Sequence, residues 1–147
     1  MSPFNWRTVL LAKHALHVSL IHFPIALFII AAALDVIGYW LERRDFATVA
    51  YFNFTIAALA ALPAALTGVL AWQWQLEGQH LKGVLLFHVL AALGSTAIIG
   101  MTWWIHYRAR IKSENSLPTW RLLLECVGIV LLGLTGHLGG FLSGVNS

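Results

Sequence analysis

Histidine is the residue whose chemistry stands out, because most of the seven histidines lie within or beside long apolar runs. Imidazole binds metal ions through a ring nitrogen and is costly to place in hydrocarbon. A histidine inside a membrane segment therefore indicates a functional site with a partner. The candidates within or at the start of such runs are His17, His22, His88 and His137. Their positions depend on the helices that the apolar runs form.

The composition predicts an integral membrane protein. Of 147 residues, 59% are hydrophobic and only 10% are charged, with a mean hydropathy of +0.78. Soluble domains carry about 25% charged residues, so this chain cannot cover a water-facing surface. In a membrane protein, the net charge of +3 reflects the basic residues of cytoplasmic loops and their contact with anionic lipid, rather than binding of nucleic acid. The single cysteine, Cys126, excludes an intrachain disulfide, and no Cys-x-x-Cys-His motif attaches haem covalently.

Four apolar runs predict an all-α, four-helix membrane bundle. About 20 residues cross a bilayer core, and the expected spans are about 18–41, 46–74, 83–106 and 119–142. We treat residues 1–147 as one transmembrane domain. The first run is too long for a signal peptide, so we expect it to be retained as a helix.

The basic residues predict that both termini lie outside. One side of the membrane receives Arg43, Arg44, Arg108, Arg110, Lys112 and Arg121, whereas the other receives Arg7, Lys13 and Lys82. Because loops rich in lysine and arginine stay in the cytoplasm, the first and third loops are expected to be cytoplasmic.

This topology places the histidines in one layer near the outer face. His22, His88 and His137 each lie a few residues inside a span from its outer end. At 1.5 Å per residue they fall about 6–8 Å below the outer edge. His17 and His80 lie just above, whereas His106 falls on the cytoplasmic side.

We expect this layer to hold haem b non-covalently. Zinc and copper sites usually include cysteine or carboxylate ligands, and none is predicted at this depth. Histidines on facing helices, flanked by glycine and alanine, suit a macrocycle held by two imidazoles. The candidate ligands are His22, His88 and His137, with His17 as a fourth if there are two haems. Lys82 and His80, together with Lys13, are expected to meet the propionates.

Asp35 and Glu125 are the other polar residues within the spans, both in the inner half. Carboxylates at such depth are paired or functional. They are expected to pair with Asn53 or with each other, or to form part of a proton path.

Several motifs resemble a bacterial membrane family, the domain of unknown function 2231, whose opening reads roughly H-P-x-x-V-H-F-P-I-A. The matching residues are His17, His22-Phe23-Pro24-Ile25-Ala26, Asp35, Thr67-Gly68, Trp72 and Gly136-His137-Leu138-Gly139-Gly140. Val18 departs from the family's usual proline. The resemblance implies a four-helix protein of the bacterial inner membrane, and related domains occur beside cytochrome-type modules.

The sequence thus favours a membrane b-type cytochrome, more an electron-transfer subunit than a stand-alone enzyme. It would pass electrons between a periplasmic redox partner and the quinone pool or a respiratory complex. Two alternatives stay open. One is a cofactor-free anchor or assembly subunit of a larger complex. The other is a metal or proton transporter that uses Asp35 and Glu125 with the histidine layer.

Overall fold

The protein is a bundle of four long helices. The computed structural model describes residues 15–75, 77–78, 80–112 and 117–143. The helices are α2 (Ala15–Trp40), α3 (Arg44–Gln75), α4 (Gly83–Ile111) and α5 (Arg121–Leu142), and the described residues contain no strand. Each helix is long and apolar enough to cross a membrane. The predicted all-α membrane bundle is therefore confirmed.

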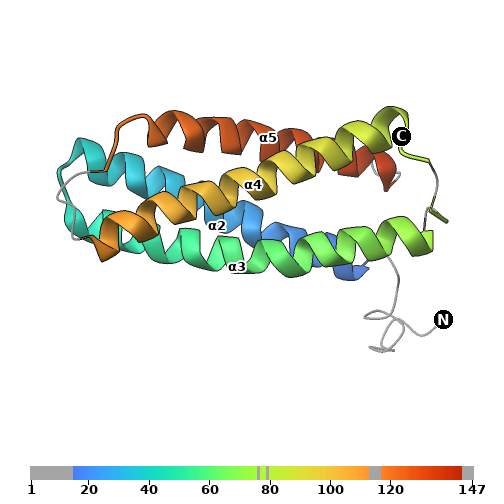
Figure 1. Ribbon diagram of the computed structural model, residues 1–147, viewed down its shortest axis with the longest axis horizontal. Coiled ribbons are helices and arrows are strands. Elements are labelled where there is room, and N and C mark those ends of the chain that lie inside the picture. Colours follow the sequence, from blue (N-terminus) through green and yellow to red (C-terminus); the bar gives the residue numbers. More distant parts are fainter. Residues whose placement is uncertain (1–14, 76, 79, 113–116, 144–147) are drawn as a thin grey trace.

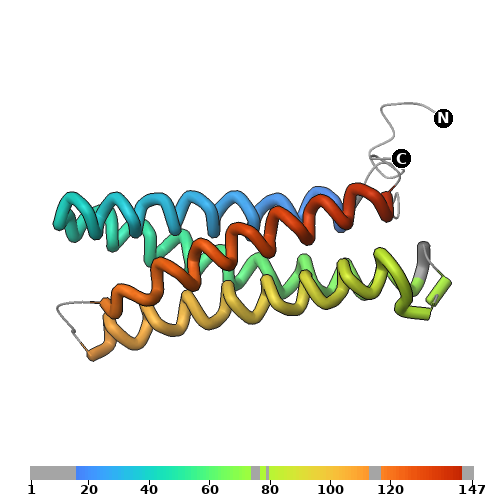
Figure 2. The backbone as a smooth tube through the Cα atoms, turned by 90° about the horizontal axis from the view of Figure 1, so that it is seen from above, coloured from blue at the N-terminus to red at the C-terminus, as the bar shows by residue number. Residues whose placement is uncertain are grey.

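The helices run alternately up and down and form two hairpins (Figure 1). α2 packs most extensively on α3, and α4 packs on α5. The hairpins meet through α3 with α4 and, more narrowly, through α2 with α5, so α2 and α4 lie diagonally (Figure 2). We call the end where α2 and α4 begin the His17 end. The opposite end, where α5 begins, is the Arg121 end.

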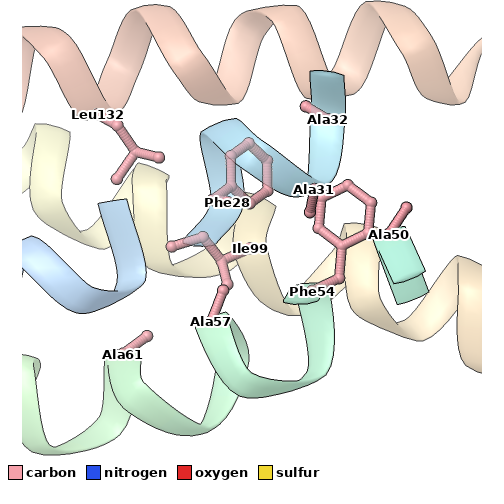
Figure 3. Close-up of a cluster of buried hydrophobic side chains, with 9 residues drawn as sticks. All are labelled: Phe28, Ala31, Ala32, Ala50, Phe54, Ala57, Ala61, Ile99 and Leu132. Atoms are coloured by element: carbon pink, nitrogen blue, oxygen red, sulfur yellow. The ribbon is translucent and has the colours of Figure 1, made fainter. Parts of the chain in front are cut away.

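An apolar core fills the waist between these ends (Figure 3). The rings of Phe28 and Phe54 meet edge to face at 5.4 Å between centroids. A Cβ atom added at Gly128 would lie 2.7 Å from Cζ of Phe28, so glycine is needed where α5 passes this ring. Ala57 and Ala61 are buried in the same core. Small residues thus let these helices approach closely, as is usual in membrane bundles.

Large apolar side chains cover the outer surface of the bundle. Leu59, Leu62 and Leu66 point outward from α3, as do Leu123 and Val130 from α5. A soluble monomer rarely exposes so much contiguous apolar surface. This surface would contact lipid, in agreement with the membrane assignment.

Candidate functional site

At the His17 end, the His17 imidazole is held between α2 and α3. Its Nδ1 lies 3.1 Å from the hydroxyl of Thr67. That hydroxyl is itself within 3.0 Å of two backbone carbonyls, those of Pro63 and Ala64. A Cβ atom added at Gly68 would lie 3.1 Å from Cε1 of the ring. Glycine therefore provides the space in which this ring packs on α3.

His88 is held between α4 and α5. Its Nδ1 lies 3.1 Å from the backbone carbonyl oxygen of Thr135. A Cβ atom added at Gly139 would lie 3.2 Å from Cε1 of His88. Each hairpin thus supplies one half-buried imidazole, one anchoring threonine and one glycine that the ring packs against.

These contacts leave Nε2 as the free nitrogen of each ring. A carbonyl oxygen can only accept a hydrogen bond, so Nδ1 of His88 carries the proton and donates to Thr135. The Thr67 hydroxyl donates to a carbonyl and so accepts from Nδ1 of His17. The hydrogen bonds of His17 to Thr67 and of His88 to Thr135 are both made through Nδ1, so Nε2 is the nitrogen of each ring that is available to another partner. His17 and His88 lie in the first two turns of α2 and α4, which begin at the same end of the bundle.

Two short sequence motifs around His17 and His88 occur in both hairpins. They are independent of the depth of these residues along the spans. His-Val occurs near the start of both α2 and α4, as His17-Val18 and His88-Val89. Leu-Thr-Gly-x-Leu occurs near the end of α3 and of α5, as residues 66–70 and 134–138. The motifs predict a threonine beside each histidine, and the structure places Thr67 beside His17 and Thr135 beside His88. The glycines differ: Gly68 of the motif meets His17, whereas His88 meets Gly139, and Gly136 meets nothing within 4 Å.

The structure does not bring the other expected haem ligands to this pair. His22 is exposed, and its Nδ1 donates to the carbonyl of Val18 on its own helix. His137 is also exposed, with its ring 4.9 Å from that of Phe141. His80 and Lys82 are exposed just before α4. Lys13 lies outside the described residues.

At the Arg121 end, four ionisable side chains meet in the interior. Nε of Arg121 donates to Oδ2 of Asp35 over 2.7 Å. Nε2 of His106 lies 3.4 Å from Oε1 of Glu125 and 3.9 Å from Oδ2 of Asp35. All four side chains are at most 5% exposed. We call this set, Asp35, His106, Arg121 and Glu125, the buried ionic cluster.

Neighbouring groups hold the cluster in place. Arg121 also donates to the carbonyls of Leu117 and Pro118, and its guanidinium lies over the ring of Tyr39. The His106 ring packs 4.8 Å from the ring of Phe54. These contacts join α2, α3, α4 and α5 at one level of the bundle.

The cluster corrects three expectations from the sequence. Asp35 pairs with Arg121 rather than with Asn53, whose amide donates to a carbonyl of its own helix. Arg121, which the sequence analysis counts among the basic residues of the cytoplasmic side, is buried in the bundle. The third span ends later than predicted, because α4 continues to Ile111, and His106 is buried in the bundle. The spacing of Arg121 and Glu125, four residues apart on one helix face, was the available signal.

Comparison with known proteins places the chain among membrane proteins. A family model described as "Predicted membrane protein (DUF2231)" matches residues 13–145. No curated protein and no solved structure matches the chain.

Proposed function

The chain belongs to this family of membrane proteins, and we propose that it is a b-type cytochrome that holds haem between His17 and His88. It would transfer electrons between a redox protein outside the membrane and the quinone pool or a respiratory complex. A bacterial inner membrane is the proposed location.

The observation that carries this proposal is the presentation of two imidazoles by opposite hairpins. Histidine ligands usually donate their second ring N–H to an acceptor, which fixes the ring and the tautomer. His17 and His88 each do so through Nδ1, towards Thr67 and Thr135. Each therefore offers the nitrogen that an axial ligand requires.

The surroundings of the pair also suit haem. Gly68 and Gly139 let the rings lie close to the neighbouring helices. The exposed Lys82 and His80 lie at the same end of the bundle, where we propose that they bind the propionates. A haem with two histidine ligands supplies one-electron transfer, with no open iron position for oxygen chemistry. One pair of anchored imidazoles supports one haem.

The test is the visible spectrum of the purified full-length protein and of four histidine variants. We expect Soret and α bands in the unmodified protein, and their loss in His17→Ala and in His88→Ala. His22→Ala and His137→Ala are the matched controls, because these exposed histidines lie at the same end of the bundle. Both controls should retain the bands.

Two results would contradict the proposal. One is a protein that stays colourless after expression with sufficient haem and after addition of hemin. The other is a pigment that persists when His17 and His88 are both replaced. A colourless protein that copurifies with other membrane subunits would favour the anchor or assembly alternative.

A further inference from the structure

The charges of the buried ionic cluster do not cancel when both carboxyl groups are ionised and His106 is neutral. Arg121 and Asp35 neutralise each other through their 2.7 Å contact. Glu125 and His106 remain, and an ionised Glu125 beside a neutral His106 would leave a net charge of −1 in the membrane interior. An uncompensated charge there is strongly unfavourable. One proton, on either Glu125 or His106, restores neutrality.

Unpartnered atoms in the same region indicate that a small species is bound. Oδ1 of Asp35, Oε2 of Glu125 and the hydroxyl of Thr102 are buried without a hydrogen-bond partner among the described residues. Thr102 lies one helical turn before His106 on α4. Buried polar atoms are almost always satisfied by protein, water or an ion. A proton on Glu125 would turn one of these acceptors into a donor.

We propose that Glu125 and His106 share one exchangeable proton, which makes the cluster a proton-binding site within the membrane domain. This function is separate from electron transfer and does not depend on haem. α3 faces His106 with the uncharged ring of Phe54. Among the described residues, the other charged side chains at the pair are Asp35 of α2 and Arg121 of α5, and the ring of Tyr39 lies against Arg121.

A divalent metal ion fits the cluster less well than a proton. Ligand atoms of Asp35, His106 and Glu125 lie within 4.8 Å of one another, which would suit a metal ion. However, Arg121 already occupies Oδ2 of Asp35, and a divalent ion would leave a net charge of +1. A proton leaves none. A monovalent ion such as Na⁺ has the same charge and must be distinguished by experiment.

A groove between α2 and α5 allows a direct chemical test. It has a volume of about 350 Å³ and is lined by apolar side chains, including Ala32, Val36 and Ile129, together with Glu125 and Cys126. Dicyclohexylcarbodiimide is apolar and reacts with protonated carboxyl groups in such surroundings. The carboxyl O–H adds across a C=N bond of the reagent, and rearrangement gives a stable N-acylurea without a leaving group.

The experiment treats the full-length protein in detergent micelles with dicyclohexylcarbodiimide and measures the intact mass and the labelled peptide. We expect one adduct, on Glu125, with a yield that declines as the pH rises. Glu125→Gln should reduce labelling to background. Glu42→Gln removes an exposed carboxyl group near the same end of the bundle and should leave labelling unchanged. Cys126→Ser controls for reaction with the thiol.

A second variant tests sharing of the proton. In His106→Gln the proton has no imidazole to move to and stays on Glu125, so labelling should increase at the pH values at which the unmodified pair still holds its proton. Absence of labelling in the unmodified protein at every pH would overturn the proposal. A yield independent of pH would overturn it as well. Protection by Na⁺ at constant pH would show that the site holds that ion instead. None of these outcomes changes with haem content, so failure here is distinguishable from failure of the cytochrome proposal.

Discussion

Both ends of the bundle contain polar side chains within the membrane domain, but the two ends pair these side chains differently. At the His17 end, neutral imidazoles donate to uncharged oxygens, those of the Thr67 hydroxyl and the Thr135 carbonyl. At the Arg121 end, a guanidinium and two carboxyl groups surround His106. The first arrangement leaves a ring nitrogen free on each histidine. In the second arrangement, the buried ionic cluster needs one bound proton to have no net charge.

The separation between the ends lets both arrangements coexist. His17 and Asp35 are eighteen residues apart on α2, and His88 and His106 are eighteen residues apart on α4. At 1.5 Å per residue this corresponds to about 27 Å. The apolar core around Phe28 and Phe54 lies between them (Figure 3). The two proposed sites therefore occupy one bundle without shared residues.

The largest effect should follow from removing the charge that balances Asp35. Arg121→Gln leaves a buried carboxylate without its partner, which costs about 3–5 kcal/mol of unfolding free energy. Unfolding in increasing sodium dodecyl sulfate, followed by circular dichroism, measures this loss. The visible spectrum of any folded fraction should be unchanged, because the histidine pair lies at the other end.

Two controls sharpen this prediction. Arg43→Gln breaks an exposed ion pair with Asp45 and should leave stability unchanged, because solvent screens such pairs. The double variant Asp35→Asn with Arg121→Gln removes both charges and should recover part of the lost stability. Equal destabilisation by Arg121→Gln and Arg43→Gln would show that the buried ionic cluster does not stabilise the fold.

A smaller effect should follow from filling the space beside His88. In Gly139→Ala the new Cβ would lie 3.2 Å from Cε1 of the ring, so the ring must shift. Such overpacking costs about 1 kcal/mol, or about fivefold in haem affinity. Hemin titration of the apoprotein measures it. Gly136→Ala is the matched control, because a Cβ there meets nothing within 4 Å, and equal effects of the two variants would argue against a specific role for Gly139.

The elements of the fold could be predicted from sequence, whereas the partners within the cluster could not. Apolar runs define membrane helices almost by length alone, since a bilayer requires about 20 residues. Ala57 and Ala61, which are buried in the core, show the four-residue spacing of small residues that permits close helix approach. However, the end of the third span was placed at His106, because Tyr107 and Arg108 resemble a membrane boundary.

The contacts between side chains of different helices could not be predicted from the sequence, for a physical reason. Depth along a helix follows from residue counting, but rotation about the helix axis decides whether a side chain faces the interior or lipid. His17 and His22 are near each other in sequence, yet His17 is half-buried and His22 is exposed. The positive-inside count treats Arg121 as a cytoplasmic charge, because it lies at the start of the fourth apolar run. The burial of Arg121 becomes clear only from the structure, in which Asp35 on another helix accepts a hydrogen bond from it.

The finest distinction lies within the histidine pair itself. His17 is anchored by the side chain of Thr67, whereas His88 is anchored by the backbone of Thr135. Thr67→Val therefore removes the acceptor of His17, at a cost of about 1 kcal/mol, whereas Thr135→Val keeps the acceptor of His88. Loss of this hydrogen bond makes His17 a less basic ligand, so the haem midpoint potential should rise in Thr67→Val and stay unchanged in Thr135→Val. Potentiometric titration of both variants measures the difference, and equal potentials would contradict the assigned anchors.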